Sequence, residues 1–146
     1  MGQQQLLLIV LGIIIVGIAI VVGIGLMKSS KSETNRQAVV NDLLNLGRKA
    51  QSYYRTPAQM GGGSQNFQGF RLSAIDTSNA NGSYSVTSGT APSGAAFIPG
   101  SVTPISSSAT IIYITGCGKE KGENKSTPVK CYVEVNTDDM QTNILN

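Results

Sequence analysis

The feature that most constrains this chain is an uninterrupted apolar run from Leu6 to Met27. Its 22 residues include no charged or polar side chain. A helix of this length spans about 33 Å, enough to cross a bilayer core of about 30 Å. Because apolar residues surround the whole helix, no polar face remains for contact with water. The run must therefore lie in lipid or be covered by other copies of itself.

The helix is expected to continue beyond Met27. Residues 28–37 are polar but contain neither Pro nor Gly, and apolar residues then recur at helical spacing from Val39 to Tyr54. Pro57 ends this pattern, because the residue before a proline avoids the helical conformation. We predict one helix from about residue 4 to residue 55, apolar all round in its first half and amphipathic in its second.

The remainder of the chain is rich in Ser, Thr, Asn and Gly and predicts a small β-sheet. No alternation of strands and helices follows Pro57, so we expect the sheet to be antiparallel. Its thin core needs the amphipathic half of the helix as a second layer. A flexible joint is expected at residues 61–64 and a loop over 88–108. Strands are expected at residues 67–75, 83–87, 109–115 and 129–135.

These patterns predict an α+β fold in which a long N-terminal helix packs on a small antiparallel sheet. The expected parts are a hydrophobic helix over residues 1–27, its amphipathic continuation over 28–56 and a globular β head over 57–146.

The composition argues against catalysis and metal binding. The chain has no His, which excludes Ser-His-Asp and Cys-His catalysis and the usual zinc and haem ligands. Residues 76–82 loosely follow a calcium-loop pattern, but Ala80 stands at a ligand position, so a turn is favoured. We therefore expect a protein that is not an enzyme, with no catalytic residue, no metal site and no cofactor.

The net charge of +3 is concentrated beside the apolar run. Residues 28–55 contain six basic and two acidic residues, whereas residues 56–146 contain five basic and six acidic ones. The basic collar begins with Lys28, Lys31 and Arg36. Since the head has no basic stripe, nucleic acid is not expected as a partner.

The chain has two cysteines, Cys117 and Cys131, at the facing ends of the two strongest predicted strands. Hairpin pairing of these strands would bring the thiols together, so a disulfide is expected. It would close a loop of roughly 15 residues and contribute about 3 kcal/mol. Two free thiols in a reducing compartment are the alternative.

A helix that is first apolar and then amphipathic, and that enters a small antiparallel sheet, resembles the plan of type IV pilins. Residues 2–9, GQQQLLLI, resemble a class III prepilin junction, which a peptidase cuts after a Gly. The resemblance implies that Gly2 precedes the cut and that Gln3 is the mature N-terminus. Many pilins have Glu at the fifth mature position, where this chain has Leu7. A disulfide near the C-terminal end is also common in pilin heads.

The resemblance implies a major subunit of an extracellular, type IV pilus-like helical filament at the cell surface. Its expected partners are further copies of the chain, the inner membrane that holds the precursor, the pilus assembly machinery and prepilin peptidase. The helices would pack together in the filament core. The residues expected there include Leu6, Leu7, Leu8, Ile9, Gly12, Gly17, Gly23 and Gly25.

Two other functions share these features: a minor pseudopilin of a secretion system, and a binding domain anchored outside the cytoplasm by a single membrane span. The positive-inside rule alone would place the basic collar and the head in the cytoplasm. The cysteine pair and the polar β head favour an exterior location instead.

Overall fold

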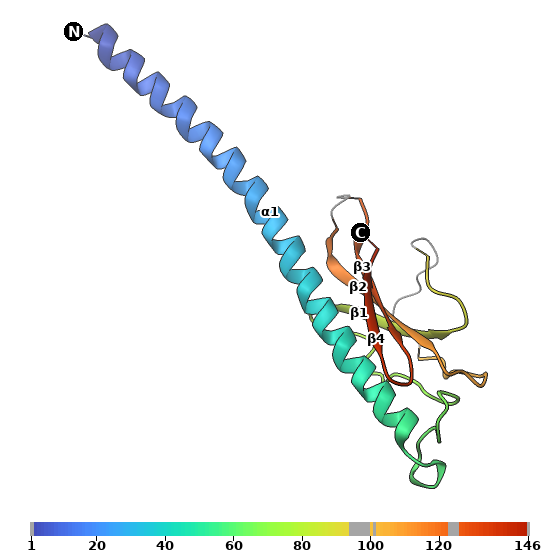
Figure 1. Ribbon diagram of the computed structural model, residues 1–146. Coiled ribbons are helices and arrows are strands. Elements are labelled where there is room, and N and C mark those ends of the chain that lie inside the picture. Colours follow the sequence, from blue (N-terminus) through green and yellow to red (C-terminus); the bar gives the residue numbers. More distant parts are fainter. Residues whose placement is uncertain (1, 94–99, 101, 123–125, 146) are drawn as a thin grey trace.

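The computed structural model describes residues 2–93, 100, 102–122 and 126–145. One helix, α1 (Gly2–Arg55), runs along one side of a β-sheet head and extends far beyond it (Figure 1). At 1.5 Å per residue, its 54 residues span about 80 Å. A short 3-10 helix, η1 (Ala58–Met60), follows it. The predicted single helix, ending just before Pro57, is confirmed.

The head is a four-stranded antiparallel sheet in the order β1-β2-β3-β4. Each strand pairs with the next one along the chain, so the sheet is a simple meander. Together with α1 it forms the two-layer α+β arrangement expected from the sequence. The strands are β1 (Gly82–Ser88), β2 (Ile112–Lys121), β3 (Pro128–Val135) and β4 (Met140–Ile144).

The core lies between the second half of α1 and the inner face of the sheet. Buried helix positions recur every three or four residues, and β2 and β3 turn alternate side chains toward them. Because the inner residues are mostly β-branched, they suit both the strand backbone and this packing. The fully buried core residues of the helix and the strands are Val39, Leu43, Ala50, Ile112, Ile114, Val129, Val133 and Val135.

The apolar face of the helix closely approaches the sheet at Gly116 of β2. A Cβ atom there would lie 2.8 Å from Val39 Cγ1 and 3.2 Å from Leu43 Cδ1, closer than packed atoms normally stand. The absence of a side chain at Gly116 therefore allows Val39 and Leu43 of α1 to pack directly on the sheet.

The strand expected at residues 67–75 is wrong. Phe67 packs on Tyr54 and Phe70 packs on Tyr53, with ring centroids 4.8 and 5.4 Å apart, so both rings cover the C-terminal end of α1. Between them Gly69 has a φ of +82°, which breaks an extended strand. This segment therefore forms an irregular cover over the end of the helix.

The other strand predictions are partly confirmed. Residues 83–87 and 129–135 lie within β1 and β3, whereas β2 begins three residues later than expected and runs through Lys121. β4 was not predicted, because it is largely exposed and its sequence, MQTNI, has no apolar alternation. β4 forms because its backbone pairs with β3.

The segment expected to be a flexible joint, residues 61–64, is a hydrogen-bonded turn against the end of α1. The Gly63 amide donates to the Tyr53 carbonyl at 2.8 Å, and the Ser64 amide donates to the Thr56 carbonyl at 3.0 Å. A Cβ atom at Gly63 would collide with the carbonyl oxygen of Asn66. Glycine is needed here for close approach of the backbone.

Replacement of Gly116 by Ala is expected to destabilise the head by about 1–3 kcal/mol, because the added methyl group overpacks the contact with Val39 and Leu43. Urea unfolding of the full chain in detergent, followed by the near-ultraviolet circular dichroism of its tyrosines, measures this. The matched control is Gly12→Ala, since nothing lies within 4 Å of a Cβ at Gly12. Equal stability of the two variants would contradict the packing.

Candidate assembly surface

The first half of α1 presents an apolar surface that touches nothing in a single copy. We call residues 6–27 the apolar half; it has the length and composition to cross a membrane, and the structure buries none of it. Its large apolar side chains are between 47% and 72% exposed. The predicted core residues Leu6, Leu7, Leu8 and Ile9 are among them, at 63–67%. In Figure 1 this half projects away from the head as an isolated rod.

The glycines of the apolar half lack side chains and therefore leave small depressions on this surface. Gly12, Gly17, Gly23 and Gly25 all lie within the continuous helix, and no atom stands within 4 Å of a Cβ built on any of them. The packing role expected of them therefore needs a second molecule. Gly2 and Gln3 lie exposed in the first turn of α1, and cleavage between them stays a prediction.

The basic collar divides into a paired and an unpaired part. Arg36 forms an ion pair with Glu33 one turn earlier, with 2.8 Å between Nη1 and Oε2. Lys28 and Lys31 are exposed, and within the described part of the chain neither forms an ion pair. Two ammonium groups thus stand directly beside the end of the apolar half.

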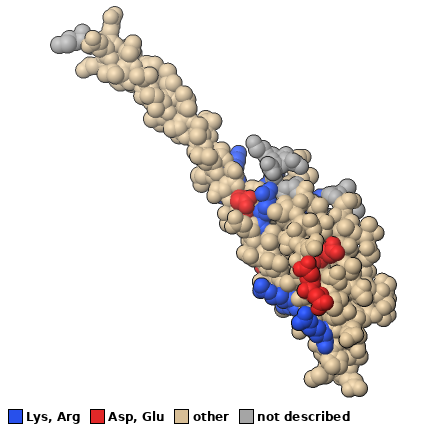
Figure 2. All heavy atoms as spheres, in the orientation of Figure 1, with Lys and Arg blue, Asp and Glu red and all other residues tan. Residues whose placement is uncertain are grey.

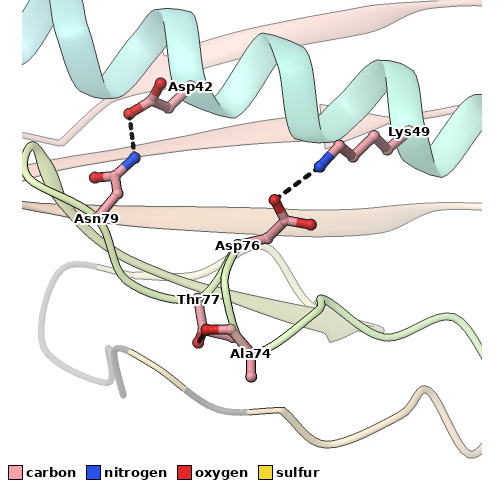
Figure 3. A network of polar contacts seen from close by, with 6 residues as sticks. All are labelled: Asp42, Lys49, Ala74, Asp76, Thr77 and Asn79. Carbon is pink, nitrogen blue, oxygen red and sulfur yellow. Dashed lines mark hydrogen bonds and ion pairs between the residues drawn. The ribbon is translucent and has the colours of Figure 1, made fainter.

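The second half of α1 is fastened to the head by a row of polar side chains spaced seven residues apart. Asn35, Asp42 and Lys49 lie on one helix face, and each bonds to residues 76–82. We call these contacts the polar clasp. Figure 3 shows two of them, Asp42 with Asn79 and Lys49 with Asp76.

Asp42 is the centre of the polar clasp. Its Oδ2 accepts hydrogen bonds from the side-chain amides of Asn79 and Asn81, both at 2.8 Å, and from the Tyr84 hydroxyl at 2.7 Å. Lys49 Nζ lies 2.7 Å from Asp76 Oδ1. The helix is therefore held to the segment before β1 by polar contacts on one side and by the apolar core beneath it.

The turn expected over residues 76–82 is present. The Asn79 amide donates to the Gly82 carbonyl, and Asn79 Oδ1 accepts from the amides of Asn81 and Gly82. The sequence analysis missed that this turn contacts α1. The signal was the seven-residue spacing of Asn35, Asp42 and Lys49 on an otherwise amphipathic helix.

The environment of the polar clasp shifts the pKa values of Asp42 and Tyr84 in opposite directions. Burial acts to raise the pKa of Asp42, but the hydrogen bonds from Asn81, Tyr84 and Asn79 outweigh it, so the pKa is lowered. Burial, followed by the hydrogen bond to Asp42, raises the pKa of Tyr84. Both shifts favour the charged carboxylate with a neutral phenol as its donor.

The predicted disulfide is wrong: Cys117 and Cys131 are both free thiols. In the pairing of β2 with β3, Cys131 stands opposite Gly116, whereas Cys117 stands opposite Lys130. Since adjacent residues of a strand point to opposite faces, this offset of one residue separates the thiols. Cys131 is buried on the face toward α1, and Cys117 is half-buried on the other face.

Replacement of Asp42 by Asn is expected to lower the free energy of unfolding at pH 7 by about 1–2 kcal/mol, because charge-assisted hydrogen bonds become neutral ones. Since the folded-state pKa is lowered, the stabilisation is present above the unfolded pKa of about 3.9. It is lost as the pH falls through the folded-state pKa. Urea unfolding of detergent-solubilised chains from pH 7 to 2.5 should therefore show the difference shrinking in acid. A difference that stays constant would contradict the role given to the Asp42 charge.

Both thiols are expected to react with iodoacetamide in denaturant without reductant, adding two carbamidomethyl groups in the intact mass. In the folded protein the reaction should be slow, because burial raises the pKa of Cys131 to about 11 and also raises that of Cys117. A denatured chain that reacts only after reduction would show that the cysteines are joined.

Comparisons of the chain with protein-family models, with curated proteins and with solved structures found no match.

Proposed function

We propose that this protein is a structural subunit of an extracellular, type IV pilus-like helical filament, and its major subunit. The observation that carries the proposal is the apolar half, which is exposed on every side and continues without a break into the helix that bears the head. One copy has nothing with which to cover it. Other copies offer the same surface in the same orientation.

The energetics favour burial by several neighbours at once. Fully burying one Val, Leu or Ile side chain from water contributes about 1.5–3 kcal/mol. Within a bilayer the apolar side chains are already removed from water, so helix association there depends on close packing instead. Gly12, Gly17, Gly23 and Gly25 permit that close packing. A surface that is apolar all round needs neighbours all round, which a repeating, non-closing contact provides as an open helical polymer.

The second half of α1 indicates which part of the subunit would face water. Its side away from the sheet carries exposed polar residues, so it does not offer a surface to a neighbour's apolar half. The apolar halves would therefore form the centre of the filament and the heads its outer layer. The exposed polar residues are Glu33, Gln37, Asn41, Asn45 and Arg48.

Before assembly the precursor would lie in the inner membrane with the apolar half as its span. Prepilin peptidase would cut between Gly2 and Gln3, and the pilus assembly machinery would extract the subunit. We infer that the head lies outside the cell, which the filament role requires and its polar β surface supports. This inference does not rest on the cysteine pair, since both thiols are free.

A single-span anchor for a binding domain is the second candidate, because the length of the apolar half also fits one bilayer crossing. An anchor would leave the chain monomeric in the membrane. A minor pseudopilin would assemble only into a short stub.

Electron microscopy of material sheared from cells, with intact-mass analysis of the same fraction, tests the proposal. We expect thin filaments made of this chain, with a mass that begins at Gln3 and includes two unbonded thiols. A chain found only as a monomer in the membrane fraction would overturn the filament and leave the anchor.

Ile18→Lys is expected to abolish the filaments, because an ammonium group would lie in the apolar core. Its matched control is Ile75→Lys, since Ile75 is an isoleucine of the head that is 83% exposed. Fractionation must show that the Ile18 variant still reaches the membrane. Filaments of normal yield from that variant would contradict a core built from the apolar halves.

A further inference from the structure

Acidic side chains gather at the turn between β3 and β4. Asp138 and Asp139 form the exposed turn, and Glu134 lies beside them, because its strand partner Gln141 also donates to Asp139 at 3.4 Å. We call these three residues the acidic turn. Figure 2 shows acidic side chains together on the head, with some basic side chains close to them and others farther away, beside the apolar half.

The acidic turn lies level with the C-terminal part of α1. Met140 packs over Gly47, Gln51 donates to the Asn136 carbonyl at 3.3 Å, and Thr137 donates to the Tyr54 hydroxyl at 3.3 Å. The turn is therefore level with about residue 50 of the helix. Lys28 and Lys31 lie about 20 residues earlier, which is about 30 Å along the helix axis. These opposite charges cannot meet within one copy.

Among the residues that the structure describes, the acidic turn forms no ion pair within its own copy. Arg48 and Arg55 of α1 lie level with it, but Arg48 donates to Asn45 at 3.4 Å and neither arginine lies within ion-pair distance of a described carboxylate. The ion pairs that the structure shows among the described residues are Arg36 with Glu33 and Lys49 with Asp76. An unpaired basic group and an unpaired acidic group thus lie about 30 Å apart along one subunit.

This separation nearly equals the length of the apolar half, about 33 Å. A second copy shifted by about 30 Å would place its Lys28 and Lys31 level with the acidic turn of the first. Its apolar half would then begin close to where that of the first copy ends. The same shift therefore brings opposite charges together and keeps the apolar centre continuous along the axis.

We propose that Lys28 and Lys31 of one subunit pair with Asp138 and Asp139 of another subunit that is shifted by about 30 Å along the filament. The partner is a second copy of this chain, so the inference rests on the proposed filament. Exposed ion pairs contribute little energy individually. Their role here is to set the axial shift, while the apolar halves hold the polymer together.

Zero-length carbodiimide cross-linking tests the pairing directly, because it joins an amine to a carboxylate as an amide only at contact distance. Filaments and detergent-solubilised monomers are treated alike, digested and analysed by mass spectrometry. Lys49 and Asp76, 2.7 Å apart within one copy, provide a positive control in both samples. We expect links from Lys28 or Lys31 to Asp138 or Asp139 in filaments alone.

The outcomes separate the pairing from the filament itself. Filaments that yield the Lys49–Asp76 link without a link from Lys28 or Lys31 would overturn the pairing and leave the filament intact. A wild-type chain that forms no filaments would overturn the proposed function first, and the pairing with it.

Charge exchange provides a second test. Lys28→Glu with Lys31→Glu is expected to reduce filament yield about tenfold, through repulsion of the acidic turn. Adding Asp138→Lys and Asp139→Lys should restore most of it. Lys119→Glu with Lys121→Glu makes the same change of charge at the exposed end of β2 and should leave the yield near normal. Loss of yield in this control, or no recovery in the exchanged variant, would contradict the pairing.

Discussion

The exposed apolar half of α1 is the constraint on which the rest of the structure depends. Exposure of its Val, Leu and Ile side chains to water has a large free-energy cost, and no described part of the head covers them. The chain therefore has two stable environments, lipid and an assembly of its own copies. A filament subunit needs both, first as a precursor and then as a polymer.

The second half of the helix connects this constraint to the head. The apolar core and the polar clasp hold α1 on two sides, with Gly116 allowing close approach and Asp42 accepting three hydrogen bonds. A head held in this way has a defined position relative to the apolar half. Charges on the head and on the helix are then a fixed distance apart, which is the condition for a regular shift between subunits.

Much of the fold could be predicted because its signals are local. The apolar run and Pro57 define the helix, and alternation of apolar residues locates β1 and β3. The errors came where tertiary contacts decide. Phe67 and Phe70 pack on the C-terminal end of α1 instead of pairing in the sheet. The register of β2 with β3 is offset by one residue from the one that would bring Cys117 and Cys131 together. For the candidate assembly surface, the apolar half and the basic collar could be predicted from the sequence. The position of the acidic turn along the helix axis could be found only from the structure.

The most direct test of the central claim is a helical reconstruction of the isolated filament by cryo-electron microscopy. The account predicts a central bundle of apolar halves, an outer layer of heads, and one class of neighbours related by a shift of about 30 Å. Heads that make all the contacts while the apolar halves point outward or lie in lipid would contradict it.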